Sequence, residues 1–213
     1  MPHHYSFIDQ LIDKFDYALS TVSGNNPTTE RNNPAGNIED ENLSASDKKL
    51  SAALMRINHA GEISAQGLYQ GQALTAKLDE VKQQMQQAAI EENDHLDWCQ
   101  TRCTELNSHT SILSPLWYIG SYALGATAGK AGDKWSLGFV AETEYQVVKH
   151  LDEHLQKLPE QDIRSREILL QMREDELNHA RIAEHAGAAK LPQPVKLAMS
   201  IVSKVMTKTA YYV

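Results

Sequence analysis

The stretch EVKQQMQQAAIEENDHLDWCQTRCTEL, residues 80–106, decides the fold that we predict. It contains no helix-breaking residue and places Glu92 three positions before His95. Positions i and i+3 lie on one face of a helix, about a turn apart. The stretch therefore predicts a long helix that aims a carboxylate and an imidazole at one point.

The same pattern occurs again in DIRSREILLQMREDELNHARIAEHAG, residues 162–187, with Glu176 three positions before His179. A single Glu-x-x-His pattern is a weak signal, because Glu and His are ordinary residues of solvated helix faces. Two copies at matched positions are a much stronger one.

Each Glu-x-x-His pair also follows a predicted helix that carries a lone glutamate. Glu62 lies 30 residues before Glu92, and Glu144 lies 32 residues before Glu176. Glu142 is the alternative to Glu144, but its spacing matches the first copy less well. The sequence therefore indicates a duplicated helix pair.

The rest of the chain predicts further helices and no series of strands. The predicted helices cover residues 5–20, 47–76, 80–106, 133–157, 162–187 and 195–208. Ser46 or Asp47 is the expected N-cap of the second of these. The predicted class is all-α, with a ferritin-like bundle of four long helices.

Residues 23–46 are rich in Asn, Pro, Gly, Ser and Thr, with almost no large apolar residue. A segment of this composition cannot bury a core, so it predicts a mobile linker or a surface loop. We therefore divide the chain into residues 1–46, an amphipathic segment with a flexible linker, and residues 47–213, the helical domain.

Composition excludes some classes of protein. The formal charge is −8, from 20 basic and 28 acidic side chains, which argues against a general nucleic-acid binder. Cys99 and Cys103 lie four apart in a predicted helix, where a disulfide would distort the helix, so we expect two reduced thiols. Reduced thiols predict a cytoplasmic protein, and residues 1–10 lack the apolar region of a signal peptide, so we expect none.

Four glutamates and two histidines from four helices are the ligand set of ferritin-like bundles that hold two metal ions. Carboxylate oxygens can bridge two irons, and imidazoles suit iron. Four carboxylates also offset the charge of two divalent ions, whereas without metal they would repel one another and take up protons. The predicted ligands are Glu62, Glu92, His95, Glu144, Glu176 and His179.

Four other polar residues are candidates for supporting these ligands: His59, Asp94, His150 and Asp175. His59 could orient the neighbouring glutamate, and either aspartate could accept the second N–H of a ligand histidine. His150 could act as an electron relay. For each of the four, an ordinary place on a helix surface is the alternative.

Two segments favour contact with a membrane. Residues 108–129 hold no formally charged side chain and are borderline for a membrane span, and Pro115, the glycines and the Trp117–Tyr118 pair suit an interfacial segment. The alternative is an internal helix packed on the bundle. Residues 194–208 place apolar side chains on one face and add three lysines, as in a helix that lies on anionic lipid; packing on a partner helix is the alternative.

From about residue 47 to the C-terminus the chain resembles the bacterial branch of the Coq7 family of demethoxyubiquinone hydroxylases. The resemblance rests on LMRINHAGE (54–62) with GLYQGQ (67–72), DHLDWC (94–99), AGDK and GFVA (within 131–141) and KVMT (204–207).

The resemblance implies an O₂-dependent di-iron monooxygenase with two iron ions per chain and the six ligands named above. Its expected substrate is the ring of a polyprenylated methoxy-methyl-benzoquinol in ubiquinone biosynthesis. It also implies peripheral attachment to the cytoplasmic side of the cell membrane. Other ubiquinone-biosynthesis proteins and a second copy of the chain are compatible partners, which the sequence itself leaves open.

Three other functions remain open. A ferroxidase or iron-storage bundle uses the same ligand set. A ferritin-like hydroxylase could act on another substrate, such as a tRNA base or a fatty-acyl carrier. A helical membrane scaffold with incidental Glu-x-x-His pairs would need no metal. The chain has no flavin or nicotinamide fingerprint, so a separate donor or a reduced cofactor is expected to supply the electrons.

Overall fold

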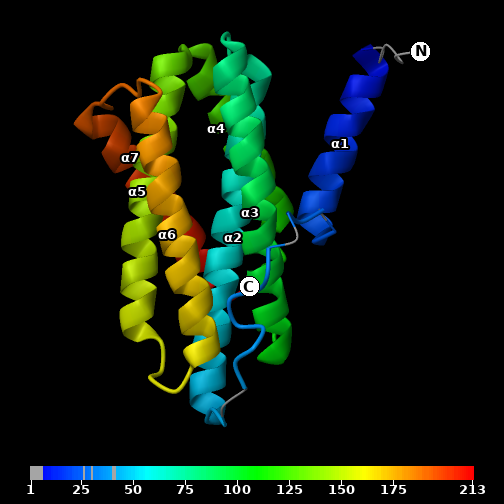
Figure 1. Cartoon of the computed structure of the whole chain (residues 1–213), viewed down its shortest axis with the longest axis vertical. Coiled ribbons are helices and arrows are strands. Elements are labelled where there is room, and N and C mark those ends of the chain that lie inside the picture. Colours follow the sequence, from blue (N-terminus) through cyan, green and yellow to red (C-terminus); the bar gives the residue numbers. More distant parts are fainter. Residues whose placement is uncertain (1–6, 26, 30, 40–41) are drawn as a thin grey trace.

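The computed structural model describes residues 7–25, 27–29, 31–39 and 42–213. Within these residues the chain forms seven helices and no strand, which confirms the predicted all-α class (Figure 1). The helices are α1 (Phe7–Ser23), α2 (Ala45–Thr75), α3 (Asp79–Glu105), α4 (Ser114–Lys130), α5 (Asp133–Lys157), α6 (Ile163–His185) and α7 (Gln193–Ala210). Residues 5 and 6 of the first predicted helix lie outside the described residues.

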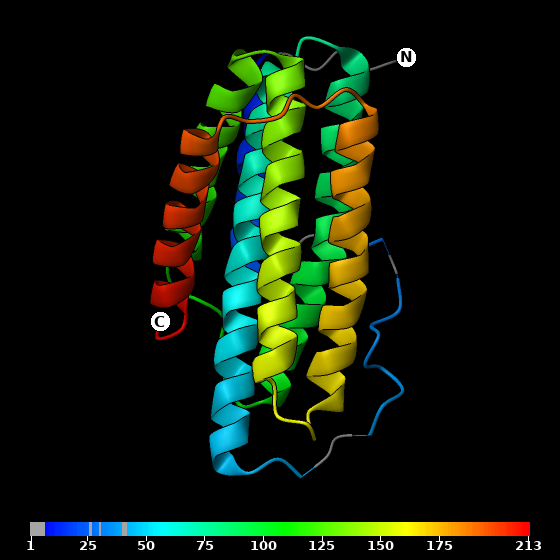
Figure 2. The same cartoon turned by 90° about the vertical axis from the view of Figure 1, so that its left-hand side faces the viewer.

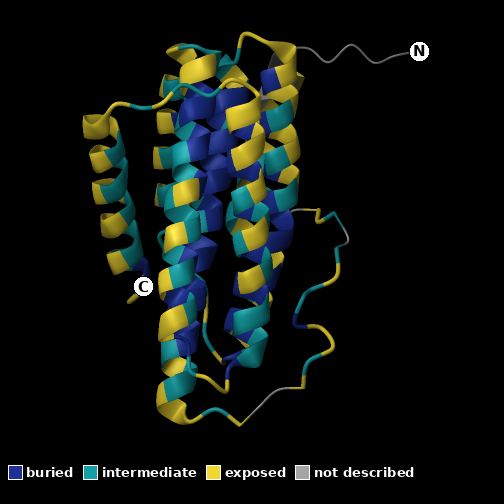
Figure 3. Ribbon diagram, turned by 60° about the vertical axis from the view of Figure 1, so that its left-hand side comes forward, coloured by how far each residue is buried: buried dark blue, intermediate teal, exposed yellow. Residues whose placement is uncertain are grey.

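Helices α2, α3, α5 and α6 form the bundle, and α1, α4 and α7 lie outside it (Figures 1 and 2). Buried residues line the interior of the bundle, while the outer faces are exposed (Figure 3). Cys99 and Cys103 are buried there as free thiols, as predicted. Cys99 packs against Met172 of α6, with 3.7 Å between the two sulfur atoms.

The predicted N-cap of α2 is wrong. Ser44 caps the helix, since its hydroxyl oxygen accepts a hydrogen bond of 3.1 Å from the backbone N–H of Asp47. Ser46 and Asp47 lie inside the first turn. The Ser44 hydroxyl also donates a hydrogen bond of 2.6 Å to the Asp47 carboxylate, which holds the cap against the first turn.

The uncharged segment forms α4, which begins with a proline in its first turn and packs along α2. Glycines on both helices allow this close approach. A Cβ atom at Gly71 of α2 would lie 2.1 Å from the carbonyl oxygen of Tyr122, and one at Gly125 of α4 would lie 2.1 Å from that of Leu68. The segment is therefore a helix packed on the bundle with its outer side exposed, and its contact with a membrane stays a prediction.

The segment between α1 and α2 runs along the outside of α3 and α6 (Figures 1 and 2). We call residues 27–39 the strap. Its described part is irregular, which agrees with the predicted surface loop. Ala35 is nevertheless fully buried, in a cluster with Trp98 of α3 and Leu169 of α6. The division of the chain at residue 46 stays a prediction.

Candidate metal centre

The structure brings all six predicted ligands together inside the bundle. Each is exposed by 6% or less. One glutamate comes from α2, one from α5, and a Glu-x-x-His pair comes from each of α3 and α6. Ligand atoms of four of them lie within 4.8 Å of one another, namely those of Glu62, Glu92, His95 and Glu176. This buried group could hold a metal ion.

The centre has two halves that share Glu92 and Glu176. Nδ1 of His95 lies 2.9 Å from Oε2 of Glu92 and 3.1 Å from Oε1 of Glu176. Nδ1 of His179 lies 3.3 Å from the other oxygen of each glutamate. Each shared carboxylate thus turns one oxygen toward each histidine.

The two lone glutamates complete the halves. Oε2 of Glu62 lies 3.8 Å from Nδ1 of His95. Glu144 is buried, and its Oε1 accepts a hydrogen bond from the hydroxyl of Tyr69. Glu142, by contrast, is half-buried and forms an ion pair with Lys196 of α7. The structure therefore places Glu144 rather than Glu142 in the centre.

The charges of the centre fit a bound cation. Burial raises the pKa of Glu62 and of Glu144 well above the usual range, and the charges of Glu92 and Glu176, respectively, raise it further. Within the described residues, no lysine or arginine forms an ion pair with any of the four carboxylates. One buried oxygen on each of Glu92, Glu144 and Glu176 has no hydrogen-bond partner. Divalent cations bound by these oxygens would offset the repulsion between the carboxylates and would give the unpartnered oxygens a partner.

An acid outside the centre holds each histidine. Nε2 of His95 lies 2.9 Å from Oδ2 of Asp175, one of the two aspartates considered for this contact, and Nε2 of His179 lies 2.7 Å from Oε2 of Glu91. In both rings Nδ1 therefore faces the interior of the bundle. Sequence reasoning missed Glu91. The duplication could have identified it, because an acidic residue directly precedes the glutamate of each Glu-x-x-His pair.

The other supporting candidates lie elsewhere. Asp94 accepts a hydrogen bond of 2.8 Å from the backbone N–H of Thr29 in the strap, and its described contacts include neither ligand histidine. His59 is buried with no hydrogen-bond partner on either ring nitrogen, and burial lowers its pKa to about 4. His150 packs against His154, with 4.0 Å between the ring centroids. No described hydrogen bond joins His59 or His150 to the six ligands.

The fold and this centre define a helical-bundle protein with a buried carboxylate–histidine group able to hold a metal ion. Residues 49–210 match the family described as "Ubiquinone biosynthesis protein COQ7". Because the match spans most of the sequence, the chain belongs to the COQ7 family.

Relatives match over nearly the full length. The chain is 57% identical over 208 residues to the 3-demethoxyubiquinol 3-hydroxylase of Nitrosococcus oceani. The aligned region covers 98% of this chain and 97% of the relative. It is 58% identical over 209 residues to the 3-demethoxyubiquinol 3-hydroxylase of Acinetobacter baumannii, with 98% and 99% covered. It is 53% identical over 211 residues to that of Chromohalobacter salexigens, with 99% of both covered.

Proposed function

We propose that this chain is an O₂-dependent di-iron monooxygenase that hydroxylates the ring of a polyprenylated methoxy-methyl-benzoquinol in ubiquinone biosynthesis. The observation that carries the proposal is the pair of shared carboxylates, Glu92 and Glu176, each of which faces both histidines. The relatives named as 3-demethoxyubiquinol 3-hydroxylases support the choice of substrate and reaction.

The proposed ligand set assigns three kinds of role. Glu62 and His95 would hold one iron, Glu144 and His179 would hold the other, and Glu92 and Glu176 would serve both. Carboxylate and imidazole donors suit iron, and four negative charges match two divalent ions. When bound, two ferrous ions supply the electrons and the Lewis acidity for the reduction of O₂.

The protein contributes orientation and exclusion of water. Asp175 and Glu91 hold the outer nitrogen of each histidine, which fixes the ring with Nδ1 directed inward. Tyr69, fully buried on α2, holds one oxygen of Glu144 through its hydroxyl and leaves the other without a hydrogen bond. Burial keeps bulk water from the ligands, which would limit side reactions with solvent.

We propose that the protein attaches peripherally to the cytoplasmic side of the cell membrane through α4 and α7. Both helices pack against α2, and both expose apolar side chains on their outer sides. The larger ones are Ile112 before α4, Leu116 and Ile119 on α4, and Leu197, Ile201, Val202 and Val205 on α7. Among the described helices, none is both long and apolar enough to cross a bilayer. A polyprenylated substrate would enter from this surface.

The reaction is tested by mass spectrometry of the quinones in cells that lack the gene. We expect the demethoxy precursor to accumulate, and to be converted when the wild-type gene is restored but not when a Glu176→Ala copy is. Normal ubiquinone in the deletion strain, with no second hydroxylase present, would instead favour a ferroxidase or a hydroxylase of another substrate.

The attachment is tested by flotation with anionic phospholipid vesicles. Ile119→Glu combined with Val202→Glu should abolish flotation of the purified protein. Leu170→Glu, which changes an exposed leucine on α6, is the matched control and should float like the wild type. Equal flotation of all three proteins would exclude α4 and α7 as the attachment surface.

A further inference from the structure

We infer that Arg31 of the strap is a positioning residue that holds Asp175, and through it His95, so that the two metal positions differ in how tightly they retain iron. The inference rests on the proposed di-iron site and adds an inequality between its halves. The half with His95 is expected to release its ion slowly, and the half with His179 to release it quickly.

The contacts form a continuous chain from the strap to the centre. Nη2 of Arg31 lies 2.6 Å from Oδ2 of Asp175, and the same oxygen lies 2.9 Å from Nε2 of His95. The other oxygen of Asp175 accepts a hydrogen bond of 3.0 Å from the side chain of Gln171. Both oxygens of this carboxylate are therefore held, which fixes the plane of the group that orients His95.

Arg31 reaches His95 by a second path. Its guanidinium carbon lies 5.1 Å from the centroid of the Trp98 ring, a cation–π contact. The Trp98 ring in turn packs against the imidazole of His95, with 5.4 Å between the centroids. The one arginine therefore supports His95 both through an acid and through an aromatic ring. A lysine could supply the charge, but not the planar group that does both.

The strap holds Arg31 in place on either side. Before it, the backbone N–H and the hydroxyl of Thr29 donate to Asp94, which is fully buried. The carbonyl of Pro27 accepts a hydrogen bond of 3.0 Å from the side chain of Asn93. These contacts join the strap to α3 within three residues of Glu92 and His95.

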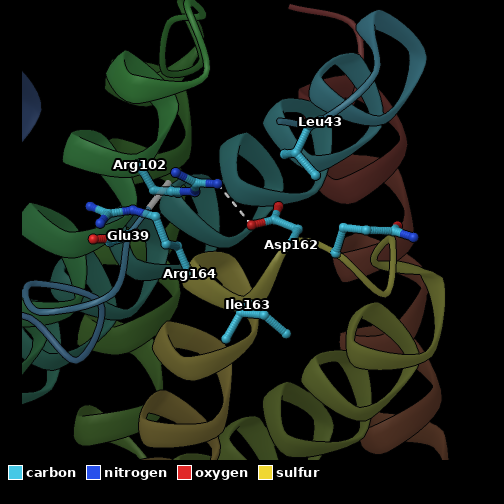
Figure 4. A pocket seen from close by; sticks show the side chains of 7 residues that line it. Glu39, Leu43, Arg102, Asp162, Ile163 and Arg164 are labelled. Atoms are coloured by element: carbon cyan, nitrogen blue, oxygen red, sulfur yellow. Dashed lines mark hydrogen bonds and ion pairs between the residues drawn. The ribbon is translucent and has the colours of Figure 1, made fainter. Parts of the chain in front are cut away.

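After Arg31, the strap is fixed to α6. Ala35 is buried in the core, and the guanidinium of Arg164 donates to the carbonyl of Ile38. Glu39 then lines a small pocket beside Arg164 and the buried ion pair of Arg102 with Asp162 (Figure 4). The strap thus spans from α3 to α6, the two helices that carry the histidines.

The other half of the centre has no such support. Glu91, the acid that holds His179, is 31% exposed, against 17% for Asp175. Its second contact is a hydrogen bond of 2.9 Å from Gln87, and among the described residues it forms no ion pair with a lysine or an arginine. Since α3 and α6 carry equivalent patterns, the difference comes from the strap, which lies outside the duplicated helices.

The test loads the full-length protein with two equivalents of Fe²⁺ without oxygen and follows release to a ferrous chelator. Wild-type protein should release one equivalent quickly and one slowly. Arg31→Gln should accelerate the slow phase by about tenfold, the lower end of the 10–100-fold effect of losing an outer partner, and leave the fast phase unchanged. Arg173→Gln is the matched control, because Arg173 lies on α6 two residues before Asp175 but forms its ion pair with Asp152. It should change neither phase.

Two further measurements separate positioning from general loss of structure. The unfolding midpoint of metal-free Arg31→Gln should stay near that of Arg173→Gln, since a purely structural defect would lower it and accelerate both phases. Arg31→Lys keeps the charge but not the planar fork, so its slow phase should lie between those of the wild type and Arg31→Gln. It also provides the test if Arg31→Gln does not fold.

An unchanged slow phase in Arg31→Gln, or equal acceleration of both phases, would overturn the role of Arg31. Two bound irons released at one common rate by the wild type would overturn the inequality and leave the proposed function standing. A wild-type protein that binds no iron would instead overturn the proposed metal site.

Discussion

Helices α2 and α5 occupy equivalent positions in the duplicated bundle, and each carries the lone glutamate of its half. Their surroundings differ. α2 is buried along most of its length, between the bundle on one side and α4 on the other, whereas α5 keeps much of its outer face half-buried or exposed. The proposed ligands are thus nearly symmetric, while α4 packs mainly on α2, and the strap holds the acid of only one histidine. A symmetric ligand set therefore does not imply two equivalent metal positions.

Removal of a shared ligand should have the largest effect. Glu176→Ala is expected to lose both irons and to lower turnover by roughly 10³-fold or more, beyond the range of outer partners. Glu62→Ala and Glu144→Ala should each keep one iron, and chelation should show the slowly released ion in Glu144→Ala and the quickly released ion in Glu62→Ala. Iron analysis and circular dichroism are the measurements. A Glu176→Ala protein with two irons and full turnover would contradict the ligand assignment.

The acids that hold the histidines should have the next largest effect. Asp175→Asn and Glu91→Gln should each weaken one metal equivalent by about 10–100-fold, and the other equivalent much less. We expect the larger change for Asp175→Asn, because that acid is held by both Arg31 and Gln171. Anaerobic titration with Co²⁺ measures both equivalents separately. Equal losses from the two variants would mean that the halves are supported alike.

The duplicated set of glutamates and histidines, which is the symmetric part of the centre, could be predicted from the sequence. The Glu-x-x-His spacing follows from the helix period, and the repeated interval from each lone glutamate identified Glu62 and Glu144 without structural information. Glu91 was missed because only a comparison of the two copies, in which Asp175 precedes Glu176 as Glu91 precedes Glu92, indicates it.

The asymmetric part could not be predicted. The strap has a composition that cannot form a core, and composition does not reveal that Thr29 contacts Asp94 or that Arg31 contacts Asp175, 144 residues further along the chain. The error at the N-cap of α2 has a local cause. Ser44 and Ser46 are both suitable caps before the same helix, and only the backbone geometry distinguishes them.

Substitutions at two glycines of α2 test how closely α4 packs on that helix. Gly71→Ala should lower the free energy of unfolding by about 1–3 kcal/mol, because its Cβ would lie 2.1 Å from the Tyr122 carbonyl and force α4 away. Gly61→Ala is the matched control. A Cβ there meets nothing within 4 Å, so the change should be neutral or stabilising by about 0.5–1 kcal/mol. Urea unfolding of the metal-free proteins measures both, and equal values would mean that α4 packs loosely.

The smallest expected effect on stability concerns a hydrogen bond between α5 and α2, the helices that carry the two lone glutamates. Nδ1 of His154, on α5, donates a hydrogen bond of 2.8 Å to Asn58 of α2. Burial lowers the pKa of His154 to about 2, with the charges of His150 and Lys157 as smaller causes. The His154 side chain therefore stays neutral in the folded protein at pH values where the same side chain in the unfolded chain, with its ordinary pKa of about 6.5, takes up a proton.

The sign of the pH dependence follows. Between pH 6.5 and about 2 the unfolded chain binds more protons, so this contribution to stability is present above pH 6.5 and is lost as the pH falls. The loss approaches about 1.4 kcal/mol per pH unit for one group. His154→Gln, which cannot titrate, should reduce the fall in unfolding free energy from pH 7 to pH 5.5 by about 1 kcal/mol. His185→Gln, at an exposed histidine at the end of α6, should leave that fall unchanged. Equal pH profiles for the two variants would show that protonation at His154 does not oppose the packing of α5 on α2.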